Sequence, residues 1–349
     1  MVFHLDPITR RKLQRFRSLR RGWWSFLVLT ALLVLAAFAE LLANSRALMV
    51  KYDGHFYLPT YTAFHPGTDF GESYSYEVNY RKLQSRFRAE GGGNWVLMPP
   101  VPYNPYENAF ESGVYPPTRP SVAQKHYLGT DTTGRDVLTR LFYGFRTAMI
   151  FSLLYIVLVY LVGISIGCMM GYFGGGFDIT AQRVVEIWAN MPFLYIVIIV
   201  ASILTPNLGL LLAIVVMFSW TGMTYYMRTA TYKEKARDYV AAAEVLGAGT
   251  GRIIFSHILP NAISTIVTFI PFTVNDALTS LTALDFLGFG LPPPTPSLGE
   301  LLRQGTANLN APWIVASTFG ALVLVLSLVT FVGEAIREAF DAKKFTIYE

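Results

Sequence analysis

Long apolar segments recur along this chain, and few folds can accommodate them. They lie at 25–42, 149–173, 191–204, 208–227, 262–289 and 313–332. A helix needs roughly 20 apolar residues to cross the hydrocarbon core of a bilayer, so these segments predict six transmembrane helices, the third of them short. Composition agrees, because 53% of the residues are hydrophobic and only 15% are charged, whereas soluble domains are about 25% charged. The sequence therefore predicts an all-α integral membrane protein.

The amino-terminal segment 1–22 is basic and leads directly into the first apolar run. Its cations are Arg10, Arg11, Lys12, Arg15, Arg17, Arg20 and Arg21. Trp23 and Trp24 follow at once, which is typical of a membrane interface rather than of a nucleic-acid-binding arm. We therefore expect a first transmembrane helix at 23–43 with a cytoplasmic amino terminus. A cleaved signal peptide is the alternative, since Ala37-Phe38-Ala39 fits the cleavage pattern, but the apolar run continues past that site.

The positive-inside rule, by which cytoplasmic loops are rich in Lys and Arg, also orients the rest of the chain. Positive residues follow the fourth apolar segment and mark a cytoplasmic loop, namely Arg228, Lys233, Lys235, Arg237 and Arg252. An even number of crossings before this loop agrees with a cytoplasmic amino terminus. The predicted layout is a periplasmic insertion at 44–144, a five-helix core at 145–340 that contains the loop 229–261, and a cytoplasmic tail at 341–349. In a bacterium this topology places the chain in the inner membrane, in contact with lipid.

The insertion 44–144 has a composition unlike the rest of the chain. Its prolines favour irregular or extended backbone and stand at 99, 100, 102, 105, 116, 117 and 120. Its many Tyr and Phe residues argue against simple disorder. The sequence predicts a small ordered insertion of mixed short elements. It is either a cap over the membrane domain or a contact for a soluble binding protein or for substrate.

The second predicted span contains a regular series of small residues. Gly163, Gly167 and Gly171 are four residues apart and form a stripe on one helix face. Such a stripe lets another helix approach closely, either in a dimer interface or within the chain. Cys168 in the same segment is the one cysteine of the sequence and is expected to be a packing residue.

The cytoplasmic loop contains a segment built for rigidity. Ala and Leu are strong helix formers, so 238–246 is predicted to be a helix. Gly247 then supplies the backbone freedom that ends it. A second helix is expected from 250 to 259, with Pro260 opening the next element. Two short helices joined by a glycine bend form a knob that suits docking to another protein.

This loop resembles the cytoplasmic EAA loop of bacterial ABC importer permeases, most closely that of the oligopeptide, dipeptide and nickel branch. The pattern falls on Ala242, Ala243, Gly247, Leu259 and Pro260. Ala241 stands where the leading Glu is usual, and Glu244 follows three residues later. The resemblance implies that Tyr239, Ala242, Ala243, Glu244, Gly247, Leu259 and Pro260 contact an ATPase subunit.

Two outer motifs are similar to the same branch. The first matches the pattern H-x-LGTD-x-x-GRD at His126, Leu128, Gly129, Thr130, Asp131, Gly134, Arg135 and Asp136. The second matches LSFLG-x-G-x-x-PPTPSWG at Phe286, Leu287, Gly288, Gly290, Pro293, Pro294, Thr295, Pro296, Ser297 and Gly299. Asp285 replaces a usual Ser and Leu298 a usual Trp, which indicates a divergent subgroup. Locally, Thr132 or Thr133 can cap a helix that starts near Gly134. Arg135 and Arg140 can also pair with Asp131 and Asp136.

The fifth apolar segment is the least apolar of the six. Asn275, Asp276, Thr279 and Thr282 fall roughly on one side of a helix. An ionisable group at membrane depth is costly unless it faces a cavity or a partner. These residues therefore form either the wall of a translocation pathway or a hydrogen-bond network between helices.

Motifs for catalysis are missing from the sequence. No GxxxxGK[ST] phosphate loop, HExxH metal site or G-x-S-x-G elbow occurs. The chain is therefore expected to be no enzyme and to hold neither cofactor nor metal, with ATP and Mg bound by partner subunits.

The resemblance covers about residues 122–340 and implies a type I ABC importer permease fold. It implies as partners a second, different permease, two ATP-binding subunits and a periplasmic substrate-binding protein, and no nucleic acid. The long insertion resembles the subgroup that imports oligopeptides and peptide-like antibiotics of the microcin C type. The alternatives are a membrane-anchored periplasmic binding or structural protein, and an importer of nickel or another small solute.

Overall fold

The computed structural model describes residues 7–109 and 114–340 and is mostly helical. Among these residues, five helices are long and apolar enough to cross a membrane. They are α2 (Arg20–Ala37), α5 (Val137–Phe173), α8 (Leu208–Lys235), the helix Thr250–Leu287 and α13 (Pro312–Phe340). A sixth span is formed if the bent pair α6 (Gly175–Ala189) and α7 (Phe193–Ile203) is counted as one. The prediction of a six-helix membrane protein is confirmed to this extent.

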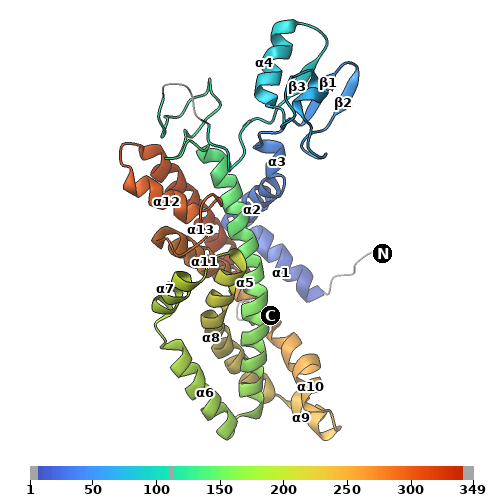
Figure 1. Ribbon diagram of the computed structural model, residues 1–349. Helices are drawn as coiled ribbons and strands as arrows, with labels where there is room; N and C mark the ends of the chain where they lie inside the picture. Colours follow the sequence, from blue (N-terminus) through green and yellow to red (C-terminus); the bar gives the residue numbers. More distant parts are fainter. Residues whose placement is uncertain (1–6, 110–113, 341–349) are drawn as a thin grey trace.

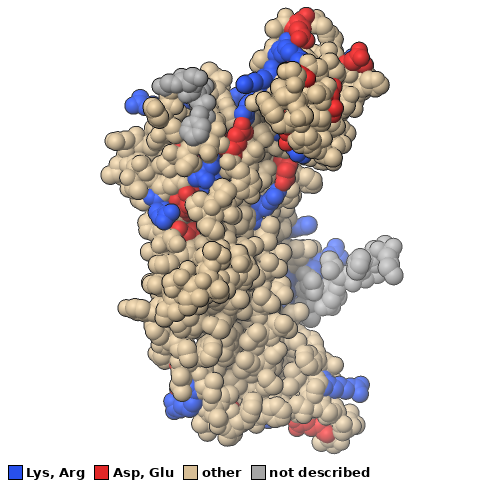
Figure 2. All heavy atoms as spheres, in the orientation of Figure 1, with Lys and Arg blue, Asp and Glu red and all other residues tan. Residues whose placement is uncertain are grey.

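The long helices form one elongated bundle with a small domain at one end (Figure 1). The domain inserted after the first helix marks the insertion end, and α9 (Asp238–Val245) and α10 (Thr250–Arg252) lie at the opposite end. The face in Figure 2 carries Lys, Arg, Asp and Glu at both ends, with a broad uncharged band between them. Such a band matches the hydrocarbon region of a bilayer.

The third span differs in one respect from its prediction. The expected segment 191–204 corresponds to α7, which has 11 residues and reaches only about 16 Å at 1.5 Å per residue. The segment before it, 175–189, lies outside the predicted spans and forms a further helix, α6. Pro192 lies between the two helices, which meet at an angle of 63°. Proline cannot donate a helical hydrogen bond, so the chain bends there.

The glycine stripe packs inside the chain, against α8. A side chain at Gly163 would approach Met223, one at Gly167 would approach Met227, and one at Gly171 would approach Thr231. Each glycine thus allows close backbone contact between α5 and α8, which is the internal-packing alternative. Cys168 lies on the same helix and is buried, as expected of a packing residue.

The insertion has a core of its own. Its three-stranded antiparallel sheet has the order β2-β1-β3, with β1 at Met49–Tyr52, β2 at His55–Tyr57 and β3 at Trp95–Leu97. One face of the sheet packs against α4 (Tyr80–Glu90) and the turn η1 (Gly67–Phe70) around a buried cluster. The cluster includes Val50, Phe70, Leu83, Phe87 and Val96. The prediction of mixed short elements after the first helix is confirmed.

Several boundaries lie elsewhere than the sequence suggested. Helix α5 begins at Val137, inside the predicted insertion 44–144, and Asp136 caps it by accepting a 2.7 Å hydrogen bond from the amide of Thr139. The expected cap by Thr132 or Thr133 near Gly134 is therefore wrong. The basic amino-terminal segment forms α1 (Pro7–Ser18), and the short α3 (Ala39–Leu42) follows α2. The predicted cytoplasmic tail 341–349 lies outside the described residues.

Candidate functional site

The first candidate site is the end loop, residues 236–249, which joins α8 to the helix beginning at Thr250. Helix α9 within it ends in a Schellman motif. The amide of Gly247 donates to the carbonyl of Glu244 at 2.9 Å, and that of Ala248 donates to the carbonyl of Ala243 at 3.0 Å. Gly247 has φ +79°, the left-handed conformation that glycine adopts without steric cost. The predicted glycine bend is present.

The end loop is held rigid by a small apolar cluster. Val240 and Ala243 of α9 are buried against Ile253 and Ile258, which lie on η2 (Ile253–Ile258). Val245 and Leu246 point the other way and are 88% and 87% exposed. One face of α9 is thus fixed to the bundle, and the tip presents apolar side chains to its surroundings. Exposed apolar groups on a rigid support are typical of a protein contact.

Polar contacts fasten the base of the loop. The hydroxyl of Tyr239 donates a 2.8 Å hydrogen bond to Glu234, whose carboxylate also pairs with Arg237 at 3.1 Å. Burial and this carboxylate raise the pKa of Tyr239 to about 12. The hydroxyl of Tyr172 on α5 lies 3.3 Å from Glu244. Tyr239 and Glu244, two of the predicted coupling residues, therefore tie α9 to the ends of α8 and α5.

The predicted boundary at Leu259 and Pro260 is a change of helix type, with Pro260 in the first turn of α11, and the expected break in the helix is absent. Helical backbone continues without a break from Thr250 to Leu287, through α10, η2 and α11 (Leu259–Leu287). The six residues of η2 form a π-helical turn immediately before Leu259 and Pro260. A π turn is wider than an α turn, and proline neither donates nor packs closely in an α turn. The wide turn lets the helix accommodate Pro260.

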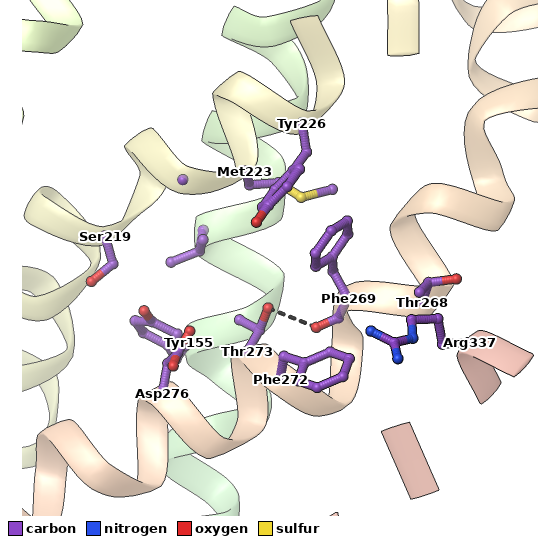
Figure 3. Close-up of a pocket in the computed structure, with 12 residues that line it drawn as sticks. Tyr155, Ser219, Met223, Tyr226, Thr268, Phe269, Phe272, Thr273, Asp276 and Arg337 are labelled. Atoms are coloured by element: carbon purple, nitrogen blue, oxygen red, sulfur yellow. Dashed lines mark hydrogen bonds between the residues drawn. The ribbon is translucent and has the colours of Figure 1, made fainter. Parts of the chain in front are cut away.

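The second candidate site is a cavity of about 390 Å³ among α5, α8, α11 and α13. Aromatic side chains form much of its wall, and Asp276 of α11 and Arg337 of α13 line it as well (Figure 3). The lining residues include Tyr155, Val159, Ser219, Met223, Tyr226, Thr268, Phe269, Phe272 and Thr273. More than half of the lining residues lie on α5, α8 and α13, where the sequence analysis identified no pathway residues. The fold brings them together with those of α11.

Of the four residues predicted to form a pathway wall, only Asp276 lines this cavity. Asn275 donates a 2.8 Å hydrogen bond to the hydroxyl of Thr330 on α13. Thr279 is exposed, and the backbone carbonyl of Thr282 packs against Gly299. The structure therefore places both predicted alternatives on one helix, with Asn275 in a contact between helices and Asp276 facing a cavity.

The third candidate site is at the insertion end, where the two outer motifs meet. Asp131 accepts a 2.8 Å hydrogen bond from Arg135, and both side chains are buried. Arg140 on α5 lies 2.8 Å from Glu300 on α12 (Leu298–Ala307) and 3.1 Å from the carbonyl oxygen of Pro294. These contacts join the first motif to the second in one buried ionic network. Local spacing predicted an ion pair of Arg140 with Asp131, which lies 3.5 Å away, but the sequence did not identify Glu300 as a member of the network.

A second buried pair completes the first motif. His126 Nδ1 lies 2.8 Å from the carboxylate of Asp136, and the ring of Tyr103 stacks on the imidazole at 3.9 Å. Gly129 and Gly134 have φ values of +73° and +86°. A side chain at Gly129 would approach the indole nitrogen of Trp313. The motif is therefore a tightly packed turn that fixes the start of α5.

The second motif folds around Asp285. Its carboxylate accepts a 2.7 Å hydrogen bond from the amide of Leu291 and another from the hydroxyl of Ser297. Gly288 ends α11 with φ +85°, and Gly290 packs against the backbone of Asp285. Pro296 is buried, whereas Pro294 is exposed. Asp285, which stands where a Ser is usual, is thus the centre of this turn.

Comparison with known proteins gives consistent matches. The family model described as "Binding-protein-dependent transport system inner membrane component" matches residues 163–346. The chain is 39% identical over 340 residues to the inner membrane ABC transporter permease protein YejE of Escherichia coli, covering 97% of this chain and 98% of that protein. It is 38% identical over 364 residues to the peptidoglycan transport system permease protein YejE of Agrobacterium fabrum, with 97% and 94% covered.

A more distant relative matches a shorter stretch. The dipeptide transport system permease protein DppC of Haemophilus influenzae is 35% identical over 256 residues, which is 71% of this chain and 85% of that protein. The family model covers more than half of the chain, and two relatives match it over nearly its full length. The chain therefore belongs to the binding-protein-dependent transport system inner membrane components, the multi-pass, non-catalytic permease subunits of ABC importers.

Proposed function

We propose that this chain forms half of the translocation pathway of an ABC importer for peptides or peptide-like compounds. Family membership implies ATPase subunits and a binding protein as partners. In the proposed complex this chain pairs with a second, different permease, and two ATPase subunits supply the energy. The end loop, the amino terminus and the carboxyl terminus face the cytoplasm, and the insertion faces the periplasm.

The observation that carries this proposal is the uninterrupted helix between the end loop and the cavity. Its first turn packs under α9, and its residues from Thr268 to Asp276 line the cavity. Thr250 and Thr268 are separated by about 27 Å along a helix with a rise of 1.5 Å per residue. A displacement of the exposed tip at Val245 and Leu246 therefore reaches the cavity wall through one rigid element. Shifts of whole helices are one of the general ways in which proteins transmit a conformational change.

The distribution of charge supports the proposed orientation. Lys233 and Lys235 lie in the last turn of α8, and Arg237 follows at the start of the end loop. The basic helix α1 precedes the first span, and its residue Phe16 packs against the last turns of α13. Both groups of cations then lie on the same side of the membrane, as the positive-inside rule expects.

The insertion supports a contact with a soluble protein rather than a cap alone. Phe56 and Trp95 both pair with Lys51 in the sheet register, so the three side chains share one face. This face is opposite to the one that packs on α4, and Phe56, Trp95 and Leu97 are exposed on it. The two aromatic rings are 6.3 Å apart. An exposed patch of aromatic and apolar side chains suits a binding-protein interface.

The relatives support a peptide-like substrate over nickel. The matched proteins are described as dipeptide and peptidoglycan transport permeases. The two relatives that cover 97% of this chain also span its insertion, whereas the dipeptide permease covers 71%. This extent of similarity favours the subgroup for larger peptides and peptide-like antibiotics of the microcin C type.

Reconstituted transport tests this proposal directly. The permease, its partner permease and the two ATPase subunits are purified together in proteoliposomes and supplied with the binding protein and labelled peptides. ATP-dependent accumulation is expected and is abolished when the ATPase subunit is inactivated. Absence of peptide accumulation in the presence of ATP and binding protein contradicts the proposed substrate class.

Orientation is measured separately by cysteine labelling. Cys168 is buried, so new cysteines at Leu246 and Leu309 report their own exposure. A membrane-impermeant maleimide applied from the periplasmic side is expected to label L309C and not L246C. Labelling of L246C from that side refutes the cytoplasmic position of the end loop.

A further inference from the structure

Asp276 is the one acidic residue among the described residues that line the cavity. It projects into the cavity from the middle of α11 and is exposed there (Figure 3). Within residues 7–109 and 114–340, no hydrogen bond or ion pair to its carboxylate is found. A carboxylate at membrane depth is costly unless a cavity or a charged partner compensates it. Asp276 is therefore an anionic group that a ligand can reach.

The surroundings of Asp276 suit a cation. Tyr155 lies beside Asp276, and Tyr226 and Phe269 form the neighbouring wall (Figure 3). The rings of Tyr226 and Phe269 stack at 3.8 Å. Aromatic faces attract cations, and they do so more strongly where water is partly excluded. One carboxylate with several aromatic rings is a common way to bind an ammonium group.

A metal ion fits this cavity less well than an ammonium group does. Hard divalent cations require six or more oxygen ligands in most protein sites. Among the described residues there is no group of three or more His, Cys, Asp or Glu side chains that could hold a metal ion. A single carboxylate satisfies a primary ammonium, because the remaining donors can bond to hydroxyl groups such as that of Ser219, which also lines the cavity.

We propose that Asp276 binds the amino-terminal ammonium group of a peptide as it crosses the membrane. The inference rests on the proposed function and specifies the substrate class of the same cavity, namely peptides with a free amino group. Arg337 lines the same cavity on the side of Thr268 and Phe272, away from Asp276 (Figure 3). The cavity thus has a negative and a positive side, which favours entry of a zwitterionic peptide in one orientation.

The test compares two peptides in two forms of the complete reconstituted complex. The probes are labelled trialanine and N-acetyl-trialanine, taken up with ATP and the same binding protein. The same binding protein supplies both forms of the complex, so any preference that it has for one peptide affects both uptake ratios equally. In the wild-type complex trialanine is expected to enter faster. In the Asp276→Asn complex the ratio of the two uptake rates is expected to fall about tenfold, because a charge-assisted hydrogen bond is lost.

Two further variants separate this role from a structural one. Asp276→Glu keeps the charge and is expected to retain most of the wild-type ratio. Arg337→Gln changes the charge on the other side of the cavity. This complex is still expected to import trialanine faster than N-acetyl-trialanine. ATPase stimulation by the loaded binding protein measures whether each complex is assembled and coupled.

Specific results overturn the proposal. If Asp276→Asn slows both peptides equally while ATPase stimulation persists, Asp276 does not recognise the amino group. If Asp276→Asn lowers the yield of assembled complex, the carboxylate pairs with the partner permease instead. If wild-type complex imports neither peptide, the proposed function itself fails, and this inference fails with it.

Discussion

The guanidinium of Arg140 on α5 donates a 2.8 Å hydrogen bond to the carboxylate of Glu300 on α12, and both side chains are buried. The pair joins the two outer motifs, which are far apart in the sequence. Arg140 also donates to the carbonyl oxygens of Pro105 and Pro294, each at 3.1 Å. One side chain thus holds together the insertion, the start of a span and the second motif.

Replacing Arg140 by Met is expected to destabilise the protein by about 3 kcal/mol, because buried Glu300 loses its 2.8 Å partner and keeps only Arg135 at 3.6 Å. The matched control is Arg146→Met on the same helix. Arg146 pairs with Glu40 at 2.7 Å, but both side chains are partly exposed, so a loss of at most about 1 kcal/mol is expected. Thermal unfolding in detergent measures both. The double variant Arg140→Met, Glu300→Met is expected to regain much of the loss. If Arg140→Met and Arg146→Met lower the unfolding temperature equally, the buried pair of Arg140 and Glu300 has no special structural role.

The sequence allowed the spans, the inserted domain and the family to be predicted because these depend on local signals. Apolar length predicts a span, and glycine in the end loop predicts a turn. Asp131 and Arg135 are four residues apart and could be paired from the sequence, as the structure confirms at 2.8 Å. These features need no knowledge of which helices are neighbours.

Features that depend on neighbouring helices could not be predicted. Arg140 lies 3.5 Å from Asp131, as the local spacing predicted, but its nearer partner at 2.8 Å is Glu300, which is 160 positions away in the sequence. Pro260 indicated an end to the helix, yet packing and a π turn carry the helix through it. Asn275 and Asp276 are adjacent but have different roles, because α13 lies on one side of α11 and a cavity on the other.

Packing between α5 and α8 gives a second prediction. At Gly167 a Cβ atom would lie 2.8 Å from Cβ of Met227 and 3.0 Å from the amide nitrogen of Arg228. Gly167→Ala therefore requires the two helices to separate and is expected to cost about 1–3 kcal/mol. The control is Gly320→Ala on α13, where no atom lies within 4 Å. That change is expected to be neutral or slightly stabilising.

Thermal unfolding temperatures of the two glycine variants in detergent test this contact. A large decrease for Gly167→Ala with no decrease for Gly320→Ala is expected. If Gly167→Ala unfolds at the wild-type temperature, the two helices are not in close backbone contact at this position.

The conformation of Gly247 gives a third prediction. Its φ of +79° is strained for other residues, although no atom lies within 4 Å of the position that a Cβ would take. Gly247→Ala is therefore expected to weaken the bend by about 1–2 kcal/mol through backbone strain alone. Gly247→Asn should cost less, since Asn tolerates this region. Gly249 has φ −70° and open space around it, so Gly249→Ala is the control.

Peptide uptake and ATPase stimulation by the reconstituted complex measure these effects. Both activities are expected to decrease in the order Gly249→Ala, Gly247→Asn, Gly247→Ala. If Gly247→Ala and Gly249→Ala have equal activities, the left-handed bend at the end of α9 is not required for coupling.

The tip of the end loop gives the final prediction. Leu246 is 87% exposed, so its side chain contributes almost nothing to the stability of this chain alone. A charged group there is tolerated in water but costs a few kcal/mol when an apolar partner surface covers it. Leu246→Asp is therefore expected to leave expression and thermal unfolding unchanged and to reduce co-purification of the ATPase subunit at least tenfold, about 1.4 kcal/mol in binding free energy.

Leu309 at the insertion end is 77% exposed and serves as the matched control. Leu309→Asp introduces the same charge at a similarly exposed leucine, and full retention of the ATPase subunit is expected. If Leu246→Asp retains the ATPase subunit as well as Leu309→Asp does, the exposed tip of α9 is not where the energy of ATP hydrolysis enters this permease. The continuous helix from the end loop to the cavity would then need a different source of motion.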